Sequence, residues 1–292
     1  MILNKNLFGE QIKKNPMLRS KYMEPPFSVL DTKNAHWRKR KRRWLSLGIK
    51  SELGRDALSF TWTKNHLEKC GKGGLADKGG TSIFDPVLAE LMYNWFCPEG
   101  GTILDPFAGG SVRGIVAHYL GFKYVGVELR GEQVKSNKMQ ARVILPKGNQ
   151  PKWIEGDSHI ELQKKSIPLA DFVFSCPPYM NMEVYSDHPS DLSNMDDEKF
   201  IKNYTKIIYQ ACRHLKKGGF ACFVVGDIRG KDGFYKDFLT ITKRAFYKSE
   251  MKLYNEMVLL NMIGSAMLRA NIFEKSKKLV KTHQNVFVFK KG

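Results

Sequence analysis

The stretch that most constrains this chain runs from Thr102 to Arg130. It opens with a short apolar run at 102–104 and then reaches the small-residue turn Ala108–Ser111. A segment with apolar residues at helical spacing follows and ends at Gly121, and a second apolar run ends at Glu128. This order predicts a strand, a glycine turn, a helix and a second strand, which together make a βαβ unit.

The turn and the acidic residue of this unit suit a nucleoside-bearing ligand. Glycine lets backbone approach a ligand without a Cβ in the way, and Glu128 at a strand tip suits two ribose hydroxyls. The spacing Gly109-Gly110-x-x-x-Gly114 is not the G-x-G-x-x-G of dinucleotide enzymes, and no P-loop motif is present. An oxidoreductase and a P-loop enzyme are therefore disfavoured, whereas a merely tight turn stays open as an alternative.

A second unusual turn follows the apolar run Ala170–Ser175, and it reads Cys176-Pro177-Pro178-Tyr179. Two prolines cannot continue a strand ladder, so the strand must stop there in a rigid turn. In an open α/β sheet, ligands bind at the carboxyl ends of the strands. The sequence therefore predicts that both turns lie at one binding edge.

Three further elements follow from local patterns. Residues 25–31 read as an extended segment, and Asp85 with Pro86 makes an N-cap and first turn for a helix that reaches Phe96. A helix from about Asp196 to Lys217 is predicted to end at Gly218-Gly219.

Jointly, the phrase Asp105-Pro106-Phe107-Ala108-Gly109-Gly110-Ser111 with Glu128, and the Pro-Pro-Tyr turn, resemble the motifs of S-adenosylmethionine-dependent DNA amino-methyltransferases. The likeness covers roughly residues 81–292. The stretches FSVLD…SLGIKSELGR and KTHQNVFVF are also similar, less closely, to the methyltransferases of phages and mobile elements. It implies an α/β, Rossmann-like, seven-stranded methyltransferase sheet with helices on both faces. It also implies S-adenosyl-L-methionine as the cofactor and DNA as the partner.

The resemblance also implies which residues bind the cofactor. In the family, a segment before the glycine turn covers the methionine end of the cofactor, and an acid at the third strand tip holds the adenine amino group. Asp157 stands at that tip, although a solvated loop aspartate is an alternative. The cofactor-binding candidates are Ser82, Phe84, Asp105, Phe107, Ala108, Gly109, Gly110, Ser111, Glu128 and Asp157.

By the same resemblance, Cys176, Pro177, Pro178 and Tyr179 carry the chemistry. An exocyclic base amine is a poor nucleophile because its lone pair is delocalised into the ring. Fixed acceptors on its protons, from the first residue and the first proline carbonyl, would free that lone pair. Tyr179 would stack on a base flipped out of the duplex. We expect direct transfer, with adenine N6 as the leading target.

The sequence departs from the family at Cys176, where the family has Asp, Asn or Ser. A thiol is a weak acceptor, so another group would have to replace it; the nearby candidates are Ser175, Glu183, Asp187 and Asp191. Cys176 as a covalent nucleophile is an alternative, but the usual Pro-Cys order is absent. Cytosine N4, an RNA substrate, and a nucleic-acid-binding protein that has lost catalysis stay open.

The charge distribution points to a polyanionic partner. The net charge is +19; residues 1–80 carry +11, residues 81–228 carry −1 and residues 229–292 carry +9. The excess therefore flanks a nearly neutral centre, which favours nucleic acid over mere solubility. We divide the chain into a basic N-terminal extension, residues 1–80, and a methyltransferase domain, residues 81–292. The extension is expected to contact DNA.

Two stretches supply the expected phosphate contacts. Trp37, Trp44 and Leu45 fall close to one face of a predicted helix, and the basic residues between the tryptophans are expected to fan outward, although a solvated charge run is the alternative. The second stretch lies near the C-terminus. The nucleic-acid-binding candidates are Arg38, Lys39, Arg40, Lys41, Arg42, Arg43, Lys277 and Lys278.

Other sequence features exclude several classes. No apolar stretch approaches the roughly 20 residues that a membrane-spanning helix needs, and the N-terminus shows no signal-peptide block. Five cysteines form no C-x-x-C pair, which indicates reduced thiols and no zinc site. We expect a cytoplasmic protein without membrane contact or a metal; the sequence does not indicate an oligomeric state.

Overall fold

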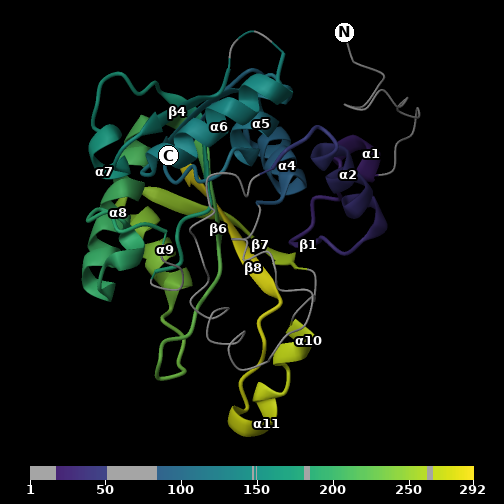
Figure 1. Ribbon diagram of the computed structural model, residues 1–292, viewed down its shortest axis with the longest axis vertical. Coiled ribbons are helices and arrows are strands. Elements are labelled where there is room, and N and C mark those ends of the chain that lie inside the picture. Colours follow the sequence, from purple (N-terminus) through teal and green to yellow (C-terminus); the bar gives the residue numbers. More distant parts are fainter. Residues whose placement is uncertain (1–17, 51–83, 147, 149, 181–184, 262–265) are drawn as a thin grey trace.

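In the part of the chain that the structure describes, eight strands form one sheet in the order β1-β7-β8-β6-β5-β2-β3-β4 (Figure 1). The computed structural model describes residues 18–50, 84–146, 148, 150–180, 185–261 and 266–292. The strands are β1 (Val29–Asp31), β2 (Thr102–Asp105), β3 (Lys123–Glu128), β4 (Lys152–Glu155), β5 (Ala170–Ser175), β6 (Leu215–Val225), β7 (Met251–Leu260) and β8 (His283–Lys291). Only β8 runs antiparallel to its neighbours, β6 and β7.

The expected seven strands are all present, and β1 adds an eighth at the edge. β1 pairs in parallel with Val258–Leu260 of β7. The sequence indicated only an extended segment at this place, because three residues are too few to show a periodic pattern. The described part of the basic extension, residues 18–50, therefore contributes to the sheet itself.

The helices cover both faces of the sheet (Figure 1). They are α1 (Leu18–Tyr22), α2 (Ala35–Leu45), α4 (Pro86–Phe96), α5 (Val112–Tyr119), α6 (Gly131–Ile144), α7 (Ser158–Glu161), α8 (Asp197–His214), α9 (Phe238–Lys248), α10 (Ala266–Arg269) and α11 (Ile272–Ser276), with a 3-10 turn at Leu192–Asn194. As expected, Asp85 caps α4 by accepting a hydrogen bond from the backbone N–H of Val87 at 3.0 Å.

One predicted helix end was wrong. The sequence indicated a helix from Asp196 to Lys217, but α8 ends at His214 and β6 starts at Leu215. Leu215 pairs with Ala170 of β5 and is buried, and Lys216 binds Asp171 at 2.7 Å. These contacts with a distant strand decide the boundary, and local sequence does not show them.

The core has one cluster on each face of the sheet, because side chains alternate along each strand. In β5, Phe172 and Phe174 belong to the cluster under α4 and α5, and Val173 belongs to the cluster under α8 and α9. Tyr93 of α4 packs edge-on against Phe174, with ring centroids 5.4 Å apart. Within the described residues, no helix is long and apolar enough to cross a membrane.

Helix α2 is anchored in this core through its two tryptophans. Trp37 and Trp44 are fully buried, as expected, whereas Leu45 is exposed. Arg40 corrects the expectation that all six basic side chains fan outward, since it is buried and forms an ion pair with Glu90. The carboxylate of Glu90, on α4, is removed from water and needs this charged partner; it also accepts from Trp44 Nε1 at 2.7 Å.

Replacing Gly114 with alanine should lower the free energy of unfolding by about 1–3 kcal/mol. Gly114 lies on α5 where the helix meets β4, and an added Cβ would overlap the buried indole of Trp153. Urea denaturation measures the effect. Lys138→Ala, on the exposed side of α6, is the control and should change stability by less than about 0.5 kcal/mol. Equal stability of the two variants would show that Trp153 moves aside freely.

Candidate functional site

The two sequence motifs meet at the point where the strand order reverses. β2 lies between β3 on one side and β5 on the other, and all three strands are parallel. The carboxyl ends of β2 and β5 are therefore adjacent, as expected for a ligand site in such a sheet. The hydroxyl of Ser175, at the end of β5, donates to Asp105, at the end of β2, over 2.6 Å.

Asp105 holds this junction together from beneath. Its carboxylate is fully buried and accepts hydrogen bonds from four donors: Arg113 Nε and Ser175 Oγ at 2.6 Å, Tyr124 OH at 2.8 Å and the backbone N–H of Phe107 at 3.1 Å. The resemblance implied a cofactor contact for Asp105. The structure instead places it under the turn, where its side chain is fully buried and does not reach the surface.

Arg113 is a support of the glycine turn that sequence reasoning missed. Its guanidinium donates to the carbonyls of Phe107 at 2.6 Å and Ala108 at 3.0 Å, and it lies 4.6 Å from the ring centroid of Phe84. Burial is the largest single influence and opposes its charge, but Asp105, Tyr124 and Cys176 together outweigh burial, so the pKa of Arg113 is raised. The sequence did contain a signal for this residue, namely a basic side chain in the first turn of an apolar helix directly after the glycine turn.

The glycine turn presents a partly exposed surface above this support. Gly109 has φ +51°, donates its N–H to Glu128 Oε2 at 2.8 Å and accepts from Asn137 Nδ2 at 2.7 Å. Glu128 also accepts from the backbone N–H of Arg130 at 3.0 Å. Phe107, Gly109, Gly110 and Glu128 remain partly accessible, whereas Ala108 and Ser111 are buried.

Ser111 gives a test of whether this turn fits a ligand. Its hydroxyl is buried without a hydrogen-bond partner in the structure. A buried polar atom of this kind normally has a partner, so its place in the turn is consistent with a ligand that approaches the glycines. The turn, Ser111 and Glu128 together fit a ligand with a ribose and further polar groups.

A pocket of about 590 Å³ extends this surface along the edge of the sheet. Its walls come from the residues that follow β3, from the tip of β4 and from the loop after the Pro-Pro turn. Asp157 is one of the lining residues and caps α7 by accepting from the N–H of His159 at 2.8 Å. The lining residues are Leu129, Arg130, Gly131, Glu132, Glu155, Gly156, Asp157, Ile160, Ser186, His188 and Ser190.

Sequence reasoning missed the role of the loop that holds Ser186, His188 and Ser190. The sequence analysis considered this polar loop only as a source of hydrogen-bond acceptors for the substrate amine. Asp191 is in fact buried and accepts from Ser186 Oγ at 2.8 Å, so it fixes the loop. Asn194 adds a bond to the carbonyl of Ser186 at 2.6 Å. The loop thereby forms the outer wall of the pocket.

The Cys-Pro-Pro-Tyr turn stands beside the glycine turn. Tyr179 is half-buried, its ring lies edge-on to Phe238 at 5.9 Å, and its hydroxyl accepts from Gln284 Nε2 at 2.5 Å. The Sγ of Cys176 lies 3.8 Å from that hydroxyl. Burial, followed by the neighbouring Cys176, raises the pKa of Tyr179, so the phenol stays protonated at neutral pH. Gln284 was another residue that the sequence did not indicate.

The groups proposed to replace the acceptor at Cys176 fall in different places. Ser175 is fully buried and donates to Asp105, so it is not accessible to a substrate amine. Asp191 is buried in its own loop, and Asp187 is exposed. Glu183, like Ser82 of the cofactor-binding candidates, lies outside the described residues. Pro177 is buried and Pro178 half-buried, which fixes the turn.

The basic candidates divide into exposed and engaged side chains. Arg38, Lys39, Arg42 and Lys277 are exposed, and Arg43 and Lys278 are half-buried. Lys41 forms an ion pair with Asp85 at 3.0 Å. Arg40 is in the core, as described above. The phosphate contacts expected of this group therefore depend on its exposed members.

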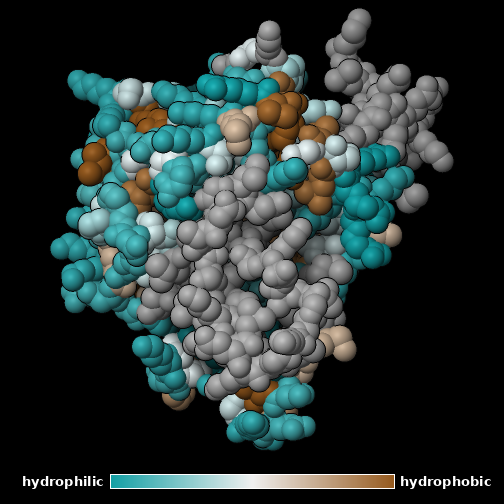
Figure 2. Space-filling view, in the orientation of Figure 1, coloured by the Kyte–Doolittle hydropathy of each residue, from teal (hydrophilic) through white to brown (hydrophobic). Residues whose placement is uncertain are grey.

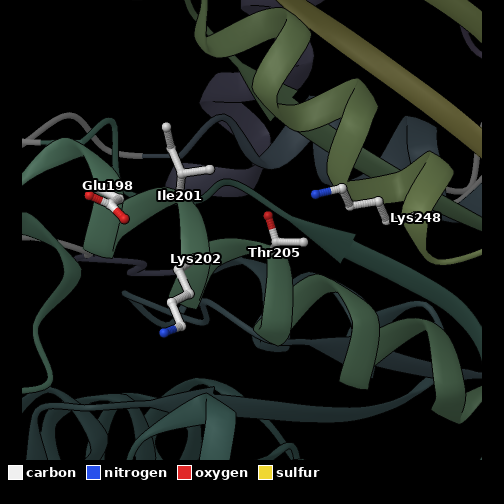
Figure 3. Close-up of a pocket in the computed structure, with 5 residues that line it drawn as sticks. All are labelled: Glu198, Ile201, Lys202, Thr205 and Lys248. Carbon is white, nitrogen blue, oxygen red and sulfur yellow. The ribbon is translucent and has the colours of Figure 1, made fainter.

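A smaller hollow on the surface lies apart from these residues. It measures about 350 Å³ and is lined by Glu198, Ile201, Lys202, Thr205 and Lys248 of α8 and α9 (Figure 3). It contains none of the residues that the sequence singled out. Among the described residues there is also no group of three or more acidic, histidine or cysteine side chains placed to hold a metal ion.

Comparison with solved structures finds matches to the fold, whereas the sequence comparisons find none. No protein-family model and no curated protein matches the sequence. A solved structure described as a methyltransferase complexed with SAH matches with a TM-score of 0.50 and 12% identity, over 73% of this chain and 51% of that one. TrmN from Thermus thermophilus matches with a TM-score of 0.48 and 16% identity, over 71% and 49%.

A third match is the magnesium protoporphyrin IX methyltransferase of Synechocystis PCC 6803 with bound SAM. Its TM-score is 0.45 and its identity 11%, over 83% of this chain and 97% of that one. This chain spans about half the length of the other two structures. At these identities the matches establish architecture alone. The chain has the Rossmann-like α/β fold of methyltransferases, with its antiparallel β8 inserted beside β7.

Proposed function

We propose that this protein transfers a methyl group from S-adenosyl-L-methionine to an exocyclic amine of a DNA base, most simply adenine N6. The observation that carries the proposal is the junction of the glycine turn with the Cys-Pro-Pro-Tyr turn through Ser175 and Asp105. This junction sets a nucleoside-binding edge directly beside a rigid turn that carries an aromatic ring. The excess positive charge supports a nucleic acid as the substrate.

The cofactor, when bound, supplies an electrophilic methyl group on a sulfonium centre. Glu128 would accept hydrogen bonds from the ribose hydroxyls, and the pocket that Asp157 lines would take the adenine. Ser111 and the backbone of Gly109 and Gly110 would hold the remaining polar groups. Phe107 would line the apolar side of the cofactor site. Its ring packs against Tyr204, with the ring centroids 5.9 Å apart.

On the substrate side, Tyr179 would stack on the target base, and Gln284 and Phe238 hold its ring in place. The carbonyl of Pro177 would accept a hydrogen bond from one amine N–H, which favours a nitrogen lone pair that faces the methyl group. The bond from nitrogen to the methyl carbon would form as the carbon–sulfur bond breaks, with the neutral thioether as the leaving group, and the methylated amine would then lose its extra proton to water. The contribution of the chain is positioning and preorganised acceptors rather than covalent chemistry.

Replacing Glu128 with glutamine should weaken S-adenosylmethionine binding by about 10- to 100-fold, because a charged acceptor contributes roughly 1.5–3 kcal/mol to a hydrogen bond. Glutamine keeps the size of the side chain and one acceptor oxygen. Isothermal titration calorimetry with the cofactor alone measures the change. Glu256→Gln, on β7 with a partner in Lys243, is the matched control and should bind as the wild type does. Unchanged affinity in Glu128→Gln would place the ribose elsewhere.

Methyl transfer from labelled cofactor to unmethylated DNA, offered both as a duplex and as a single strand, tests the proposal itself. The DNA is digested to nucleosides, which are separated by mass. N6-methyladenine is the expected product and would show that Cys176 is tolerated in the first position of the turn. N4-methylcytosine would keep the site and change the base, and methylated RNA would change the substrate. Cofactor binding without any methylated nucleoside would reject the enzymatic proposal and favour a binding protein.

A further inference from the structure

We propose that two segments beside the catalytic turn form a binding surface for unpaired nucleotides of single-stranded DNA. The segments are residues 229–236, between β6 and α9, and residues 266–281, between β7 and β8. We call them together the distal surface; they lie at the lower end of the molecule in Figure 1. The inference extends the proposed function by naming the form of DNA that the protein holds, and it rests on that function for its biological meaning.

The distal surface is continuous with Tyr179. Gly226, at the end of β6, lies so close that an added Cβ would be 3.5 Å from the Tyr179 ring. Gln284, at the start of β8, donates to the Tyr179 hydroxyl. Both segments therefore begin or end within a few residues of the ring proposed to stack on the target base. Nucleotides next to that base would reach them.

The two segments also contact each other. Lys278 Nζ packs against Gly233, and Lys281 Nζ lies 5.8 Å from the ring centroid of Tyr235. Arg229 stacks on the same ring, with its guanidinium carbon 4.0 Å from the centroid. One aromatic ring is thus near cations from both segments. The distal surface is a single unit rather than two independent loops.

Its charge fits a phosphate backbone. The distal surface holds eight basic and two acidic residues among 24, and one of the eight, Lys236, is engaged with Asp197 at 2.6 Å. Such an excess binds nucleic acid through phosphates without regard to sequence. The basic residues are Arg229, Lys231, Lys236, Arg269, Lys275, Lys277, Lys278 and Lys281, and the acidic ones are Asp232 and Glu274.

The exposed aromatic rings select unpaired nucleotides over a duplex. Phe234 is 75% exposed, and Tyr235 and Phe273 are 46% and 45% exposed. Figure 2 shows hydrophobic atoms among hydrophilic ones at this end of the molecule. Isolated exposed rings are common, but rings interleaved with cations form a stacking platform for bases. In a duplex, base faces are already stacked, so only unpaired bases can use such rings.

Phe234 is held in place before any ligand binds. The segment folds back on itself through a bridge between Arg229 and Tyr235. Gly230 N–H donates to the carbonyl of Phe234 at 2.8 Å, and Phe234 N–H donates to Asp232 Oδ1 at 3.0 Å. A ring presented on a fixed turn loses little conformational freedom on binding, which favours affinity. Its exposure therefore does not reflect a loose chain.

Fluorescence anisotropy tests the inference on the full chain without cofactor. The probes are a labelled single-stranded DNA oligonucleotide, its duplex and an RNA of the same sequence. We expect the single strand to bind more tightly than the duplex or the RNA. Phe234→Ala and Phe273→Ala should each weaken single-strand binding by about tenfold, since a base–aromatic stack contributes roughly 1–3 kcal/mol.

Two controls separate stacking from charge and from folding. Tyr209→Ala removes a ring that is 47% exposed on α8, away from the distal surface, and should leave affinity unchanged. Lys277→Gln should lower the slope of log K against log salt concentration by about 1, whereas Phe234→Ala should leave the slope unchanged. Circular dichroism spectra that match the wild type establish that each variant is folded.

The outcomes separate this inference from the proposed function. Single-strand binding that depends on Phe234 and Phe273 supports the distal surface, even if no methylated nucleoside forms and the enzymatic proposal is rejected. Wild-type affinity in both phenylalanine variants overturns the inference, even if the protein methylates DNA. Tighter binding of the duplex or of the RNA than of the single-stranded DNA also overturns it.

Discussion

Replacing Asp105 with alanine should lower the free energy of unfolding by about 3–5 kcal/mol, because it leaves the buried guanidinium of Arg113 without its anionic partner. The lost carboxylate also accepts from Ser175 and Tyr124, so two further buried donors lose their partner. Urea denaturation followed by circular dichroism measures the effect. An unpaired buried charge is one of the few changes that produce a loss of this size.

Asp171 offers the matched control. It is a half-buried carboxylate at the opposite end of β5 that accepts from Thr102 N–H at 2.8 Å and from Lys216 at 2.7 Å. Because Lys216 can return to water, Asp171→Ala should cost only about 1–2 kcal/mol. If Asp105→Ala costs no more than Asp171→Ala, Asp105 is not the support of the junction.

The sequence predicted the central fold because its strands end at residues that a local pattern identifies. Asp105, Glu128 and the prolines after Ser175 end three strands, and Asp85 begins α4 as expected. Each of these signals acts within a few residues, so a local pattern is enough. By contrast, the start of β6 at Leu215 depends on pairing with β5, a contact that no local pattern records.

The candidate site was predictable in its motifs and not in its supporting residues. Arg113, Gln284 and His188 come from a helix, a distant strand and a loop, and only the folded chain brings them to the two turns. Arg40 was misjudged for a related reason. A run of basic residues suggests solvent on all sides, but the helical period turns one of them inward onto Glu90.

Replacing Tyr179 with alanine should reduce kcat/KM for methyl transfer to DNA by about 10- to 100-fold, because the target base loses a stacking partner that contributes roughly 1–3 kcal/mol. Affinity for the cofactor should stay unchanged, since the ring lies on the β5 side of the junction and is not among the lining residues of the pocket beside Glu128. Single-turnover assays with labelled cofactor, and calorimetry with the cofactor alone, measure the two quantities.

Tyr179→Phe is the control that isolates stacking from hydrogen bonding. Phenylalanine keeps the ring and its contact with Phe238 but removes the hydroxyl that accepts from Gln284. If stacking dominates, Tyr179→Phe retains most of the activity, with a loss of about 2- to 10-fold from the freed Gln284 amide. An equal loss in the phenylalanine and alanine variants would contradict the stacking role. The hydroxyl and its bond to Gln284 would then be the feature that positions the base.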